Sequence, residues 1–176
     1  MQSAEGYIKR SLLALCAMIM LGGSLSAQSF RIGTKAPDLS GLDWLTEHPA
    51  EIKRTTLVEF FHSNNKNSAE RLDWLRGLAV ENAEQLNVVI IIRDDDHEAL
   101  RMLAENREYY YVVQTDARFL RSIGVRYVPY TYITNPKRRT LWCGNPLFLE
   151  EQILKSLIGN DNDRPLRKAT SSRTRR

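Results

Sequence analysis

Short apolar runs alternate with amphipathic stretches over the central part of the chain. Residues 57–61 and 88–92 are short, largely apolar runs, a pattern typical of strands buried on both faces of a sheet. Apolar residues recur between these runs at helical spacing; they are Leu72, Leu75, Leu78, Ala79 and Ala83. The order strand, helix, strand predicts two parallel strands joined by a crossover helix.

Capping and turn residues indicate the elements that follow. Asp95 or Asp96 can cap the start of a second helix, and Asn135-Pro136 is a turn that favours an antiparallel hairpin of the two strands around it. The remaining predicted elements are a strand over residues 110–113, a short helix over 117–123, strands over 130–134 and 140–143, and a last helix over 149–158. The sequence therefore predicts an α/β fold.

The N-terminal segment has the layout of a secretory signal peptide. Lys9 and Arg10 precede an apolar run over residues 12–22, and small residues follow up to Ala27. We expect cleavage after Ala27, or one residue away, and export to the periplasm or cell envelope. The alternative is a retained membrane anchor, but the unbroken apolar span is shorter than the ~20 residues that cross a bilayer. No transmembrane anchor is expected after processing.

Composition and charge define the rest of the chain. The chain has 176 residues, of which 43% are hydrophobic and 26% charged, which suits one globular domain, predicted here over residues 28–159. The net charge is +4, and most of the positive charge lies in residues 160–176, a Ser, Thr and Arg-rich segment expected to be a disordered basic tail. Such a tail does not predict nucleic-acid binding; attraction to an anionic membrane surface is the alternative.

Cys143 is the only thiol expected in the mature chain, because Cys16 lies in the predicted signal peptide. One thiol cannot form an internal disulfide. We expect Cys143 to be buried and inert, with intermolecular pairing or a reactive thiolate as the alternatives.

Four sequence motifs carry a resemblance to a known family. They are "IGTKAPDLSGLDWL", "LVEFF", "DARFLRSIGVRYVPYTYI" and "LWCGNP". In this order and spacing they resemble the thioredoxin-like superfamily, in its extracytoplasmic TlpA-like or ResA-like redoxin branch. The resemblance covers residues 32–158. It implies a central mixed β-sheet flanked by helices, with a redoxin-type N-terminal extension and an inserted α/β element.

The resemblance places Asn65 and Ser68 where the family has its Cys-x-x-Cys pair. Thiol exchange needs a thiolate and a second, resolving thiol, and neither residue supplies one. We therefore expect no dithiol redox activity. Asn67 and Glu70 are expected to form a capping pair at the start of the following helix, and a Ser68 nucleophile activated by His62 is a minor alternative.

Two groups of polar residues raise further expectations. The resemblance implies that Glu59 is a buried acid, and because the neighbouring strand offers no basic partner we expect it to be partly protonated or in contact with water.

Residues 94–97, Asp-Asp-Asp-His, together with His62 could bind a metal. Helix capping and a solvated turn explain this run more simply, so no metal and no cofactor are predicted.

Pro129 matches the family's cis-proline, opposite the redox loop. The resemblance implies that the main chain of Val128 pairs with an extended peptide, a contact that needs no cysteine; a purely structural proline is the alternative. The predicted groove residues are His62, Ser63, Asn64, Asn65, Lys66, Val128, Pro129 and Tyr130. The leading function is binding of a protein, peptide or small ligand in the cell envelope. The alternatives are an oxidoreductase-type enzyme acting through Cys143 or a partner, and a structural part of an envelope assembly.

Overall fold

The computed structural model describes residues 30–47 and 55–158. The predicted signal peptide at residues 1–27, its cleavage site and the basic tail at residues 160–176 lie outside the described residues. No helix in the described part of the chain is long and apolar enough to cross a membrane.

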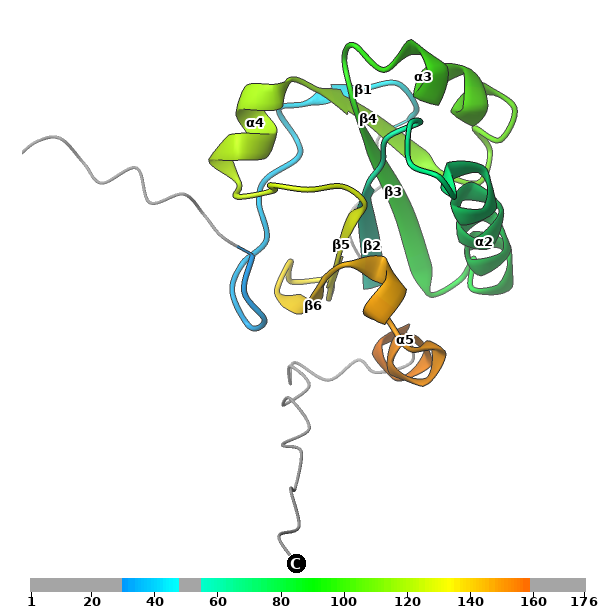
Figure 1. Cartoon of the computed structure of the whole chain (residues 1–176). Coiled ribbons are helices and arrows are strands. Elements are labelled where there is room, and N and C mark those ends of the chain that lie inside the picture. Colours follow the sequence, from blue (N-terminus) through cyan, green and yellow to red (C-terminus); the bar gives the residue numbers. More distant parts are fainter. Residues whose placement is uncertain (1–29, 48–54, 159–176) are drawn as a thin grey trace, which may run out of the picture.

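The chain folds as a six-stranded mixed sheet flanked by helices, as predicted (Figure 1). Strands β2, β3 and β4 are parallel, and β1, β5 and β6 pair antiparallel with their neighbours in the order β1-β4-β3-β2-β5-β6. The elements are β1 (Asp43–Trp44), β2 (Thr55–Phe60), α2 (Ser68–Glu81), β3 (Leu86–Arg93), α3 (His97–Ala104), β4 (Tyr111–Thr115), α4 (Ala117–Ser122), β5 (Tyr130–Thr134), β6 (Thr140–Gly144), the 3₁₀ turn η1 (Pro146–Phe148) and α5 (Glu151–Ile158).

Alternation of side chains along the strands gives the sheet two apolar faces. Leu57 and Ile90 point to one face, which helices α2, α3 and α5 cover. Val58 and Ile91 point to the other face, which is covered by α4 and by residues 30–42. Figure 1 shows α2 and α3 on one side of the sheet and α4 on the other. The central strands are buried on both sides, which explains their continuous apolar sequence.

The pattern of apolar and polar positions does not predict strand β1 or turn η1. Strand β1 has only two residues, too few for a period of two to show. It is held instead by pairing of Asp43 and Trp44 with β4 and by the indole of Trp44, which donates to the carbonyl of Leu39 at 3.0 Å.

The sheet register brings two connections to the same edge of the molecule. Strands β2 and β5 are antiparallel, and Phe60 at the end of β2 lies opposite Tyr130 at the start of β5. The segment that follows β2 therefore lies beside Pro129, which precedes β5. The peptide bond between Val128 and Pro129 is cis.

Candidate functional site: the loop before helix α2 and the cis-proline

The loop over residues 62–67 is wound into tight turns that lead into α2. The amide of Asn65 donates to the carbonyl of His62 at 3.3 Å, and the amide of Ser68 donates to the carbonyl of Asn65 at 3.0 Å. The hydroxyl of Ser68 lies 2.8 Å from both of these carbonyl oxygens. Asn65 and Ser68, the positions that the resemblance assigns to the cysteine pair, are thus one turn apart.

The predicted cap at Asn67 is wrong. Asn67 precedes the first helical residue, but its side chain makes no capping hydrogen bond. An N-cap residue normally has extended φ and ψ angles, which aim its side chain at the helix amides; Asn67 has ψ near 28°. The hydroxyl of Ser68 closes the loop in its place.

The hydrogen bonds of Ser68 do not favour a nucleophile. Its side chain is buried, with 5% exposed, and its hydroxyl faces two backbone carbonyls, one of which belongs to His62 itself. The imidazole of His62 instead contacts the side chain of Asp96 and the amide of Asn64. The hydroxyl and the imidazole are therefore each occupied by other groups.

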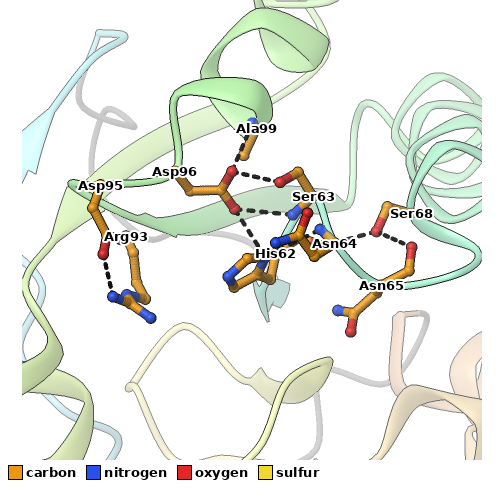
Figure 2. Close-up of polar contacts among 9 residues, drawn as sticks. All are labelled: His62, Ser63, Asn64, Asn65, Ser68, Arg93, Asp95, Asp96 and Ala99. Atoms are coloured by element: carbon orange, nitrogen blue, oxygen red, sulfur yellow. Dashed lines mark hydrogen bonds and ion pairs between the residues drawn. The ribbon is translucent and has the colours of Figure 1, made fainter.

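Asp96 connects the loop to the start of α3 (Figure 2). One carboxylate oxygen accepts from the amide of Ala99 at 3.0 Å and from the hydroxyl of Ser63 at 2.6 Å, and the other accepts from the amide of Ser63 at 2.9 Å. Asp96 is thus the helix cap, which resolves the choice between it and Asp95. Burial alone would raise the pKa of Asp96, but these hydrogen bonds and the nearby His62 outweigh it and lower the pKa.

The Nδ1 atom of His62 lies between a donor and an acceptor. The amide of Asn64 is 3.1 Å away and donates to it, while Asp96 Oδ2 is 3.2 Å away. A neutral Nδ1 with a free lone pair accepts from Asn64, whereas a protonated Nδ1 donates to Asp96. The two contacts therefore require different positions of the proton on one ring.

Three of the residues considered for a metal site, Asp95, Asp96 and His62, are engaged in other contacts. Asp95 pairs with Arg93, away from His62 (Figure 2), and the carboxylate of Asp96 accepts the bonds described above. Within residues 30–47 and 55–158, no group of three or more His, Cys, Asp or Glu side chains is placed to hold a metal ion.

Glu59 is fully buried, as expected, but it has the basic partner that the sequence did not predict. Arg71 of α2 donates to its two carboxylate oxygens at 2.7 and 2.5 Å, and the hydroxyl of Thr131 donates at 2.8 Å. The partner comes from the covering helix rather than the neighbouring strand, so the expectation of a protonated or water-contacting Glu59 loses its basis. The guanidinium of Arg71 also lies 4.1 Å above the ring of Trp74.

A cavity of about 290 Å³ opens between the loop and Pro129. Three of the predicted groove residues line it: Asn65, Lys66 and Pro129. The other residues of its lining are Phe61, Asn67, Ser68, Arg71, Pro146 and Leu147. The predicted groove residues His62, Ser63, Asn64, Val128 and Tyr130 lie outside this lining.

The main chain of Val128 is unpaired beside the cavity. Neither its N–H nor its C=O has a hydrogen-bond partner among residues 30–47 and 55–158, and Val128 is only half-buried. Strand pairing resumes at Tyr130. Within the described part of the chain, Val128 therefore offers a free donor and a free acceptor directly before Pro129.

Tyr130 and Cys143 belong to the opposite face of the sheet. The ring of Tyr130 packs against Phe30, Phe60 and Tyr127. Burial, reinforced by a hydrogen bond with Cys143, raises the pKa of Tyr130. Cys143 is partly buried, and its sulfur lies 3.7 Å from the carbonyl of Phe30. Neither side chain lines the cavity.

Solved structures with the same architecture decide the fold. A thioredoxin-like protein in its oxidized form matches with a TM-score of 0.59 and 17% identity over 73% of this chain and 97% of that one. The chain has the thioredoxin-like fold. A protein described as the thiol:disulfide interchange protein DsbE of Chlorobium tepidum matches with a TM-score of 0.60 and 19% identity over 74% and 99% of the two chains. A thiol-disulfide isomerase from Corynebacterium glutamicum matches with a TM-score of 0.57 and 15% identity over 73% of this chain and 97% of that one.

Identities this low show the thioredoxin-like fold alone. Neither a protein-family model nor a curated protein sequence matches the chain.

Sequence reasoning missed two parts of this site. Arg71 precedes Leu75 by one helical turn, and the two share the face of α2 that packs on the sheet, a signal that could have predicted Arg71 as the partner of Glu59. Pro146 and Leu147 follow the last strand in a loop without periodicity, so no local signal connects them to the cavity.

Proposed function

We propose that this protein binds an extended segment of a partner protein or peptide in the cell envelope, without dithiol redox activity. The bound segment lies between the loop over residues 62–66 and the main chain of residues 128–130. Binding is the function, and no bond is made or broken in the partner.

The unpaired main chain of Val128 is the observation that carries this proposal. A free N–H and a free C=O beside a cavity can form two hydrogen bonds with an extended chain, as in strand addition to a sheet edge. The cavity beside Pro129 then accepts a side chain of that segment. Main-chain pairing supplies affinity and the cavity supplies selectivity.

The absence of thiols from the loop supports binding without redox turnover. Residues 57–75 contain no cysteine, and thiolate chemistry needs one. Cys143 packs on the other face of the sheet, so it does not replace the missing pair. An enzyme acting through Cys143 is therefore the weaker candidate.

Export is part of the proposal and rests on residues 1–27. A basic start, an apolar run and small residues before Gln28 are the features that secretion requires. The partner is accordingly sought in the envelope rather than among nucleic acids.

Partner capture with a matched pair of variants tests the proposal. Purified protein immobilised through its C-terminus is exposed to solubilised envelope, and labelled protein is then titrated with the captured partner while amide shifts are recorded. Asn65→Trp places a large ring at the cavity, and we expect it to lower capture about ten-fold. Ser122→Trp, on α4 at the opposite face, should leave capture unchanged.

The amide shifts decide the location of the contact. We expect the largest changes at Asn65, Lys66 and Val128. Shifts confined to α4 or α5, with these three amides silent, would refute the groove.

A further inference from the structure

Turn η1 gives the cavity an exposed apolar wall. Leu147 and Phe148 are 79% and 76% exposed, and Leu147 lines the cavity together with the buried Pro146 and Phe61. Consecutive large apolar side chains that remain exposed beside a hollow mark a surface that binds an apolar group. The wall opposite the loop is thus suited to an aliphatic side chain.

The cavity also carries unbalanced positive charge. Among the described residues, its lining includes Lys66 and Arg71 and no acidic residue. Glu59 neutralises Arg71, but Lys66 is exposed and forms no ion pair within the described part of the chain. The ammonium group of Lys66 is therefore available to a carboxylate of a bound segment.

We infer that the groove selects an extended segment with an aliphatic side chain and an aspartate or glutamate two positions away from it. The aliphatic side chain contacts Leu147 and Pro129, and the carboxylate pairs with Lys66. Alternate residues of an extended chain point to the same side, so both groups can reach the groove together. This selectivity presupposes the proposed function, because pairing with Val128 is what holds the segment extended.

An anionic membrane surface fits these residues less well. Membrane contact requires several apolar side chains and several cations on one exposed surface. Leu147 forms the wall of a cavity instead, and Lys66 is the one lysine or arginine of its lining without an ion pair among the described residues. The unpaired main chain of Val128 adds a contact that a peptide can use and a lipid surface cannot.

Selection from random heptapeptides displayed on phage tests the inference. The purified protein should enrich peptides with an acidic residue two positions away from Leu, Ile or Val. Synthetic copies are then measured by fluorescence anisotropy. Replacing the acidic residue by its amide should weaken binding about three-fold to five-fold, the range of an exposed ion pair. Replacing the aliphatic residue by Ala should weaken binding about ten-fold.

Charge reversal at Lys66 separates selectivity from non-specific binding. Lys66→Glu should enrich basic residues in place of acidic ones, while the exposed control Lys35→Glu should enrich the same peptides as the unmodified protein. Leu147→Ser should lose the aliphatic preference, and Val80→Ser, a comparably exposed position on α2, should keep it.

The outcomes distinguish this inference from the proposed function. Peptides that bind and shift the Val128 amide, but show no acidic preference or the same preference with Lys66→Glu, overturn the charge selectivity and leave the groove in place. Failure to enrich any peptide overturns both. Sedimentation of the protein with vesicles of phosphatidylcholine and phosphatidylglycerol, abolished by Leu147→Ser in the absence of peptide enrichment, would assign the surface to a membrane and overturn the inference.

Discussion

Arg71, in the first turn of α2, holds both carboxylate oxygens of Glu59, which is fully buried on the central strand β2. The pair fastens the start of the helix, and with it the loop over residues 62–67, to the sheet. A bidentate arginine is suited to this task because its planar fork matches the carboxylate. Loop position and sheet stability are therefore coupled through one ion pair.

Arg71→Met should destabilise the protein strongly. It leaves a buried carboxylate with only the hydroxyl of Thr131, and breaking one side of a buried pair costs roughly 3 kcal/mol or more. Urea unfolding followed by far-UV circular dichroism measures the change in the free energy of unfolding. Arg76→Met, which breaks an exposed pair with Asp73 on the same helix, should cost less than about 1 kcal/mol.

A double variant shows whether the destabilisation comes from the unpaired charge of Glu59 or from lost packing of Arg71. Glu59→Gln combined with Arg71→Met removes both charges, so it should be more stable than Arg71→Met alone. Equal losses in the single and double variants would show that packing of Arg71 on Trp74, rather than charge, explains the effect.

The sheet was predictable from sequence, whereas the contacts between its elements were less so. The run over residues 88–92 is buried on both faces and reads as a strand without further information. The partner of Glu59 depends on how α2 lies on the sheet. No local sequence pattern predicts that arrangement. The predicted cap at Asn67 is wrong because the φ and ψ angles of that residue are set by the turn around Asn65 and Ser68. The residue type alone does not determine these angles.

Asp96→Asn should lower stability by about 1 to 2 kcal/mol at neutral pH, because the charge-assisted bonds from Ser63 and Ala99 weaken. Asp95→Asn is the matched control: its side chain is mostly exposed and pairs, among the described residues, only with the partly exposed Arg93, so its effect should stay within about 0.5 kcal/mol. Equal effects at the two positions would contradict the role of Asp96 as the link between loop and α3.

The same variant should change the acid sensitivity of folding. The pKa of Asp96 is lower in the folded protein than in the unfolded chain. The ionised carboxylate therefore contributes its full stabilisation at pH values above its pKa in the unfolded chain. This stabilisation is lost as the pH falls below about 4, towards the pKa of Asp96 in the folded protein. The difference in unfolding free energy between the protein and Asp96→Asn should therefore shrink as pH is lowered from about 5. A difference that grows on acidification would contradict the direction of this shift.

A restored cysteine pair tests the position of the loop. The unmodified protein should not reduce insulin in a turbidity assay above a thiol-free control. Asn65→Cys combined with Ser68→Cys should close an internal disulfide under mild oxidant, because the amide of Ser68 already bonds the carbonyl of Asn65 and residues three apart in such a turn lie within bridging range. Mass spectrometry after alkylation counts the free thiols. Two persistent free thiols besides Cys143 would show that the loop differs from this arrangement.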